Sequence, residues 1–206
     1  MTDSHPDEED DMTLTTMALG RMTLLKQAGL VLGGTAVLAI ASQVSVPFFP
    51  VPMTLQTLAV LMVGLTLGAR LGAITVLVWL GQAMLGAPVL ANFANGAAFA
   101  GPTAGFLVGF VGLAFLAGLA TDRGITGPVK LSLVTLAASA LLYVPGLAWP
   151  LGVAQVAGID AGWTTLDFGT VVQGFMAPFL IGDAVKAILA ALIVAGAANA
   201  LRNRQA

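Results

Sequence analysis

The sequence contains no cysteine and a single histidine, His5, among its 206 residues. Without cysteine the chain can form no disulfide, thiolate metal site or cysteine nucleophile. His5 lies in a polar N-terminal segment, which leaves no material for zinc coordination or a Ser-His-Asp triad. The motifs G-x-x-x-x-G-K-[ST], G-x-S-x-G and H-E-x-x-H are also missing. We therefore expect a protein that is not an enzyme, with no catalytic residue, no metal site and no cofactor.

Charged residues are scarce as well. Only 9% of the residues are charged and 58% are hydrophobic, whereas a soluble domain carries roughly 25% charge. The mean hydropathy of +0.95 agrees with this imbalance. A surface exposed to water cannot be built from such a chain, so the composition predicts an integral protein of the lipid bilayer. The eight Lys and Arg residues are too few to indicate nucleic-acid binding.

Most of the acidic residues lie in the first 20 positions, where six of them cluster within residues 3–11. A short, strongly acidic segment is typical of a solvated, disordered tail. It is not expected to be a signal peptide, because the n-region of a signal peptide is basic. We divide the chain into a disordered acidic tail, residues 1–20, and a membrane domain, residues 21–206.

Apolar runs define the transmembrane spans, because a helix needs about 20 such residues at 1.5 Å each to cross a bilayer. Gly, Pro and charged residues separate six runs, which predict an all-α bundle. Prolines from Pro47 to Pro52 end the first run, residues 86–103 are interpreted as an outer loop, and Pro178 opens the last helix. The predicted spans are residues 26–46, 54–68, 71–85, 104–120, 128–149 and 178–199.

Basic residues predict the orientation, because Lys and Arg are retained on the cytoplasmic side of a membrane protein. They occur before the first span, between the second and third, between the fourth and fifth, and after the sixth. The alternate loops contain none. Both termini are therefore predicted to be cytoplasmic, on the evidence of Arg21, Lys26, Arg70, Arg123, Lys130, Arg202 and Arg204.

Lys186 is the one basic residue that topology does not explain, since it lies inside the sixth span, three residues after Asp183. Residues three apart share a helix face. A charge at the bilayer centre costs about 2.5 to 3.5 kcal/mol, so the pair is expected to face the bundle interior or a wet cavity. It is either a structural ion pair or part of a ligand site.

Other polar and aromatic residues fall at the same outer level of the predicted bundle. Each has a plainer explanation, as a helix cap, a turn residue or part of an aromatic belt. Their convergence on one level favours a ligand site that opens outward. These candidates are Thr54, Gln56, Asn92, Asn95, Tyr143 and Trp149.

Glycines spaced four apart predict close helix packing. Gly64, Gly68 and Gly72 form one set, and residues 105 and 109 form another. Packing within the bundle is the simpler interpretation of both sets. Gly29 and Gly33 on the first helix allow a second interpretation, a smooth surface for a partner subunit.

Four ordered motifs resemble BioY, the biotin-binding S component of energy-coupling-factor transporters. The resemblance covers about residues 26–200. The motifs are Pro50–Leu58 (PVPMTLQTL), Gly101–Phe106 (GPTAGF) with Gly109-Phe110, Tyr143-x-x-Gly146-x-x-Trp149, and Pro178-Phe-x-x-Gly-Asp-x-x-Lys186.

That resemblance implies six helices in the cytoplasmic membrane of a prokaryote and an outward-facing biotin site. It also implies partners: a transmembrane coupling subunit and ATPase subunits that supply the energy for uptake. Asp183, Lys186 and an asparagine, Asn92 or Asn95, would be ligand contacts. Biotin fits such groups, because its ureido ring needs donors and acceptors, its bicycle suits aromatic packing and its carboxylate needs a cation.

Two other functions are compatible with the residues alone. A proton-coupled secondary transporter of a small anionic solute could use Asp183 as its titrating carboxylate, although the inverted repeats expected of such carriers are not evident. A scaffold subunit would contain Asp183 and Lys186 only as a structural pair.

Overall fold

The computed structural model describes Thr15 and residues 22–47 and 52–205. The predicted acidic tail, residues 1–20, lies outside the described residues except for Thr15. The elements in chain order are α2 (Leu24–Gln43), β1 (Ser45–Val46), β2 (Met53–Thr54), α3 (Gln56–Met84), η1 (Ala91–Phe93), η2 (Gly96–Ala100), α4 (Ala104–Asp122), α5 (Pro128–Ala148), η3 (Trp149–Val153), α6 (Ala154–Val156), η4 (Gly162–Thr165), α7 (Phe168–Phe175) and α8 (Leu180–Gln205).

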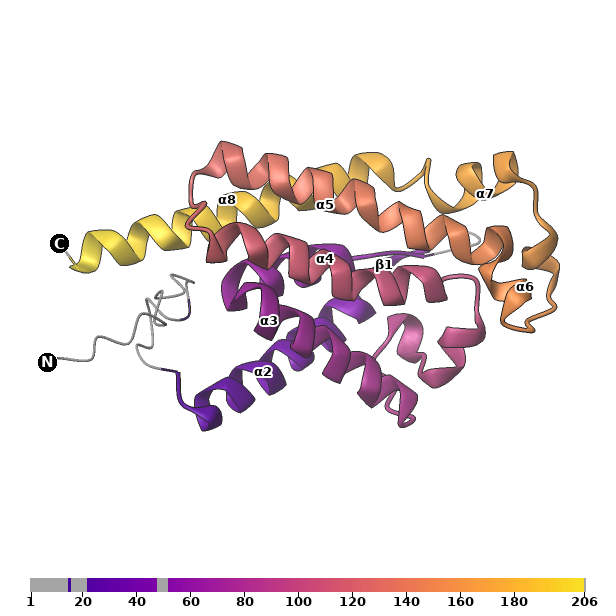
Figure 1. Ribbon diagram of the computed structural model, residues 1–206, viewed down its shortest axis with the longest axis horizontal. Helices are drawn as coiled ribbons and strands as arrows, with labels where there is room; N and C mark the ends of the chain where they lie inside the picture. Colours follow the sequence, from indigo (N-terminus) through magenta and orange to yellow (C-terminus); the bar gives the residue numbers. More distant parts are fainter. Residues whose placement is uncertain (1–14, 16–21, 48–51, 206) are drawn as a thin grey trace, which may run out of the picture.

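The long helices lie side by side along the long axis of the molecule (Figure 1). The start of α2, the α4–α5 connection and the end of α8 lie at the left end in this view. The β1–β2 pair, the connection between α3 and α4, and α6 and α7 lie at the opposite end. The described segments that carry Lys26, Arg123, Lys130 and Arg202 thus share one end of the bundle. That this end is cytoplasmic remains a prediction.

Helix α3 is a hairpin of two arms and not one straight helix. Gly68 interrupts its helical geometry with φ 82° and ψ 174°, a backbone conformation that glycine adopts without a steric penalty. A Cβ built on Gly72 would lie only 2.9 Å from Cα of Gly64, although eight residues of a continuous helix span about 12 Å. The arms correspond to the predicted spans 54–68 and 71–85.

Five helices in the described part of the chain are long and apolar enough to cross a membrane, and α3 is counted once among them. With α3 divided at Gly68, the prediction of an all-α, multi-pass membrane protein with six helices is confirmed.

Small residues bring α4 against both arms of α3. A Cβ at Gly64 would collide with the carbonyl of Ala114, and a Cβ at Gly118 would collide with the backbone of Ala69. The carboxylate of Asp122 accepts a hydrogen bond from the Ala69 N–H at 2.8 Å and so caps the second arm. Packing within the bundle is therefore confirmed as the role of Gly64.

The second glycine set packs α4 against α5. Added Cβ atoms at Gly105 and Gly109 would collide with the Pro145 carbonyl and with Leu142. Gly29 is different, since a Cβ there would meet no described atom within 4 Å.

The end of the bundle that contains β1, β2, α6 and α7, here called the loop end, has structure that the apolar runs do not specify. In the connection after α2, Ser45 and Val46 pair with Thr54 and Met53 in an antiparallel ladder. Pro145 lies inside α5, and the chain continues beyond Ala148 through the π-helix η3.

Helix α7 was not predicted. The polar side chain of Asp167 begins this helix by accepting a hydrogen bond from Thr170 N. Pro178 does not open the last helix. It lies in the turn where Phe179 N donates to Met176 O, and α8 begins at Leu180.

Candidate ligand-binding site

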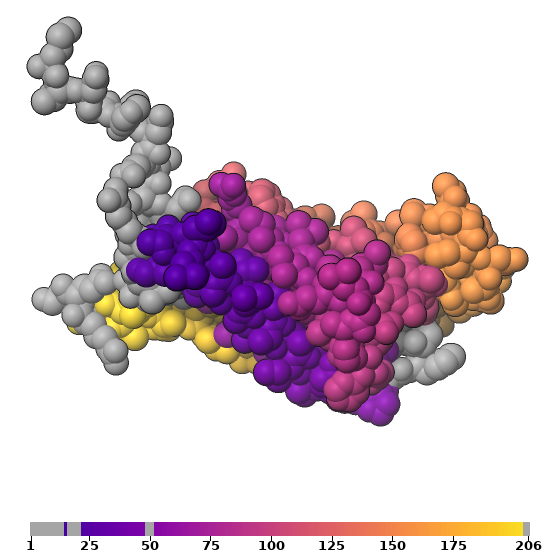
Figure 2. Space-filling model, turned by 90° about the horizontal axis from the view of Figure 1, so that it is seen from below, coloured from indigo at the N-terminus to yellow at the C-terminus, as the bar shows by residue number. Residues whose placement is uncertain are grey.

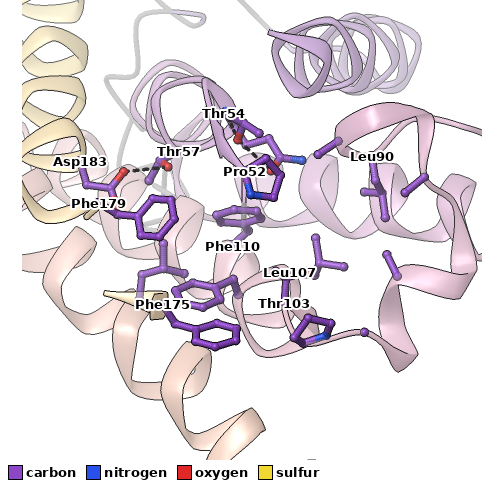
Figure 3. Close-up of a pocket in the computed structure, with 18 of the residues that line it drawn as sticks. Pro52, Thr54, Thr57, Leu90, Thr103, Leu107, Phe110, Phe175, Phe179 and Asp183 are labelled. Carbon is purple, nitrogen blue, oxygen red and sulfur yellow. Dashed lines mark hydrogen bonds between the residues drawn. The ribbon is translucent and has the colours of Figure 1, made fainter. Parts of the chain in front are cut away.

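A cavity of about 300 Å³ lies at the loop end of the bundle. This volume is at the lower limit of typical small-molecule sites. Figure 3 shows Asp183 and Thr57 at one side of it and Leu90 at the other, with the rings of Phe110, Phe175 and Phe179 between them. The lining residues are Pro52, Thr54, Gln56, Thr57, Leu90, Ala91, Asn92, Ala94, Ala98, Gly101, Pro102, Thr103, Phe106, Leu107, Phe110, Leu142, Tyr143, Phe175, Phe179, Asp183 and Lys186.

Asp183 and Lys186 form an ion pair on the first two turns of α8. The Lys186 ammonium lies 2.6 Å from Oδ1 of Asp183, and the two residues are only 7% and 8% exposed. Asp183 belongs to the first turn of α8, where the positive end of the helix dipole stabilises a carboxylate. From Leu180 the rise of about 1.5 Å per residue places Asp183 about 5 Å and Lys186 about 9 Å into the helix.

The ammonium of Lys186 has a protein acceptor for each of its three protons. Besides the Asp183 carboxylate, Nζ donates to the carbonyl oxygen of Thr54 at 3.1 Å and to Oγ1 of Thr57 at 3.3 Å. An ammonium group has three donors and no acceptor. Lys186 can therefore bind a further acceptor only by giving up one of these partners.

The carboxylate of Asp183 is held by three donors from three helices. Tyr143 on α5 donates its hydroxyl proton to Oδ2 at 2.6 Å, and Thr57 on α3 donates to Oδ1 at 3.2 Å. Lys186 supplies the third. A carboxylate has about four lone-pair positions, so Asp183, which lines the cavity, keeps capacity for a further donor.

Aromatic rings supply much of the apolar wall. Phe106 lies edge-to-face against Tyr143, with ring centroids 5.9 Å apart and an interplanar angle of 88°. Such a pair contributes about 0.5 to 1.5 kcal/mol beyond its area burial and fixes the tyrosine ring. Phe175 and Phe179, four residues apart at the α7–α8 junction, add two more rings.

Six of the eight sequence candidates line the cavity: Thr54, Gln56, Asn92, Tyr143, Asp183 and Lys186. Thr54 contributes its carbonyl to Lys186, while its hydroxyl donates to Oε1 of Gln56 at 3.0 Å. The amide of Gln56 in turn donates to Ser42 on α2 at 3.0 Å.

The other two candidates, Asn95 and Trp149, are not among the described residues that line the cavity. The Asn95 side chain caps η2 by accepting a hydrogen bond from Ala97 N at 3.3 Å. Trp149 donates its indole proton to the carbonyl of Gly101 at 2.9 Å. Both residues therefore organise the loops around the cavity.

Sequence reasoning missed Thr57 and the phenylalanines. Thr57 follows Gln56 directly, yet it contacts Asp183 from 126 positions away in the sequence, a proximity that no local pattern reveals. Phe175 lies on the unpredicted helix α7. A signal was present for the others, because Thr57, Phe106, Phe110 and Phe179 all belong to the four motifs identified in the sequence.

The chain is similar to known transport proteins over nearly its whole length. The model of the BioY family matches residues 12–203. The "Biotin transporter BioY" of Rhizobium etli is 41% identical over 76% of this chain and 82% of its own. The "Probable biotin transporter BioY" of Pyrococcus horikoshii is 33% identical over 82% and 93% of the two chains.

The fold is similar to a crystal structure described as the S-component for biotin from an ECF-type ABC transporter. The TM-score is 0.68 with 25% identity, covering 90% of this chain and 96% of that chain. These relatives are described as biotin transporters or as a transporter S-component, so the family is one of transporters and not of enzymes, in agreement with the expectation from the sequence. Because the family model and relatives above 30% identity cover most of its length, this chain belongs to the BioY family.

Proposed function

We propose that this protein captures biotin from the extracytoplasmic side, as the substrate-specific subunit of an ATP-driven ECF-type transporter in the cytoplasmic membrane of a prokaryote. The observation that carries the proposal is a buried carboxylate, Asp183, that faces an aromatic-lined cavity and is held by Lys186, Thr57 and Tyr143. A small ligand with polar N–H groups and an apolar ring system suits such a site.

Asp183 is the group that we assign to the ligand's ureido N–H donors. It retains acceptor capacity, whereas all three donors of Lys186 are engaged by protein atoms. Lys186 then acts mainly on Asp183, because the ion pair fixes the position of the carboxylate, and a charged acceptor makes a stronger hydrogen bond than a neutral one. The carboxylate end of the ligand is placed toward Asn92, in the loop across the cavity.

Energy for transport would come from other subunits. The sequence has no phosphate-binding loop, so we assign ATP hydrolysis to ATPase subunits. A transmembrane coupling subunit would link that hydrolysis to transport. The similarity to an S-component of an ECF-type ABC transporter supports this division of labour.

The proton-coupled carrier that the sequence left open is less well supported. A carboxylate that carries a proton through each cycle would have to break its 2.6 Å ion pair with Lys186 every time. Binding tests separate the two functions, because a capture subunit binds biotin in detergent without ATP or a proton gradient.

The direct test measures biotin binding to the purified protein by calorimetry, with Thr57→Val as the informative variant. Valine keeps the shape of threonine but removes the hydroxyl that joins Asp183 and Lys186. Without this hydroxyl, whose hydrogen bond to a charged group contributes about 1.5 to 3 kcal/mol, the carboxylate is no longer held in its binding position and binding must restore it, so the affinity should fall by up to roughly 10- to 150-fold.

Thr66→Val is the matched control, because Thr66 lies on the same helix, its hydroxyl donates to Met62 O at 2.7 Å, and it does not line the cavity. Its affinity should equal that of the parent. A parent protein that binds no biotin would refute the proposed function.

A further inference from the structure

The loop that closes the cavity opposite Asp183 contains a turn in an unfavourable backbone conformation. Asn92 and Phe93 both have positive φ, 55° and 57°, and Ala94 N donates to Ala91 O at 3.1 Å. Positive φ at both central residues, with this hydrogen bond, defines a type I′ turn, which favours Asn followed by Gly. Phe93 occupies the glycine position, where a residue with a Cβ costs about 1 to 2 kcal/mol.

Gln43, the last residue of α2, holds this turn from outside the cavity. Its side-chain Nε2 donates to the carbonyl of Leu90 at 3.0 Å, and its Oε1 accepts from the backbone N–H of Phe93 at 3.1 Å. The two bonds bracket Asn92, and Leu90 and Asn92 both line the cavity. Gln43 itself is not among the described lining residues.

Helix α2 is well placed to supply such a bracket. It lies on the surface of the bundle, where Figure 2 shows it as a stripe of indigo and violet atoms. Its last turn nevertheless reaches the cavity wall at a second point, since Ser42 accepts the hydrogen bond from Gln56. The end of α2 therefore touches the site through neighbouring residues that contact two separate parts of its lining.

We propose that Gln43 is a positioning residue for biotin affinity: its amide keeps the Asn92-Phe93 turn left-handed and so keeps Asn92 at the cavity. The inference rests on the proposed function, because the affinity concerned is that for biotin. Without Gln43 the strained turn relaxes toward right-handed conformations, and each binding event must restore the conformation that binds, which lowers the apparent affinity.

A ligand-free measurement tests the positioning itself. Gln43→Met keeps the length of the side chain and removes its hydrogen bonds. Hydrogen exchange of residues 90–94 should then become at least about tenfold faster, because opening of the turn no longer breaks the bonds to Gln43. Gln27→Met makes the same change on the same helix about 24 Å away and should leave the exchange of the turn unchanged. Equal exchange in Gln43→Met and the parent would overturn the inference.

Biotin binding and a second-site rescue complete the test. Gln43→Met should weaken binding about tenfold. Phe93→Gly gives the turn its preferred Asn-Gly sequence, so Gln43→Met/Phe93→Gly should return to within about threefold of the parent. A general destabilisation of the bundle would not be repaired by a glycine in an exposed loop.

The two proposals fail in different ways. Loss of affinity without recovery in the double variant, or parental affinity in Gln43→Met, contradicts the positioning role while biotin binding by the parent still stands. A parent that binds no biotin contradicts the proposed function and with it the inference, even where the exchange data show that Gln43 orders the turn.

Discussion

Replacing Lys186 with methionine removes one half of a buried ion pair and keeps most of the apolar side chain. The structure sets the size of the effect: the pair is less than 10% exposed, and the ammonium contacts Asp183, Thr54 O and Thr57. Breaking a buried pair costs about 3 to 5 kcal/mol, because the remaining charge stays buried without its partner. For a chain of about 200 residues that corresponds to roughly 6 to 20 °C in Tm.

The double variant Asp183→Asn/Lys186→Met should regain most of this stability. It contains no buried charge at the site, and the asparagine can still accept from the Tyr143 hydroxyl, which lies 2.6 Å from the carboxylate in the parent. Replacing a whole buried pair is often neutral. Its biotin affinity should stay low by about 10- to 150-fold, because the charged acceptor for the ligand is gone.

Thermal unfolding and biotin calorimetry in detergent, on both single variants and the double, measure these effects as a cycle. Lys130→Met is the matched control, since Lys130 is exposed near the start of α5; it should change neither quantity. If the double variant is stable and binds biotin as tightly as the parent, the pair is purely structural and the assignment of Asp183 to the ligand is wrong.

Further predictions concern topology, energy and packing. Cysteines placed at exposed Asn95 and Arg123 of this cysteine-free chain should label from opposite sides of the membrane; labelling from one side would contradict the six-helix topology. The purified protein should hydrolyse no ATP, and activity that persists after removal of contaminants would contradict the proposed division of labour. Gly64→Ala should destabilise the bundle by about 1 to 3 kcal/mol in thermal unfolding, because its Cβ collides with α4. Gly29→Ala, which faces open space among the described residues, should be neutral.

The ion pair could be predicted from the sequence because its signal is local. Asp183 and Lys186 share a helix face at a spacing of three, and an ionisable pair in a span is a functional hypothesis by default. Tyr143 and Thr54 were found because they lie at the same membrane level. In both cases the spacing of residues along a helix and their depth in the bilayer are enough to predict that the side chains lie near the site.

The rest of the site depends on contacts that short-range rules do not contain. Thr57 meets Lys186 across 129 positions of the chain, and its place in the Pro50–Leu58 motif does not indicate which residue it contacts. The reversal at Gly68 was foreseen only as a gap between two apolar runs. The left-handed Phe93 could not be foreseen, because turn preferences place glycine at that position.

The charges of Asp183 and Lys186 neutralise each other within the protein, and this affects which group of the ligand the site recognises. A ligand whose anion supplied the counter-charge for Lys186 would leave that lysine unpaired in the empty protein, at a cost of several kcal/mol. Here Asp183 supplies it, and protein atoms accept hydrogen bonds from all three donors of the lysine. The pair is neutral as a whole, so the ligand's charge is not needed to complete it. Biotin amide should therefore bind within about tenfold of biotin, whereas an analogue with methylated ureido nitrogens, which cannot donate to Asp183, should lose about 10- to 150-fold. Calorimetry with both analogues decides the matter: strong rejection of the amide together with tolerance of the methylated ureido ring would show that Lys186, and not Asp183, recognises the ligand.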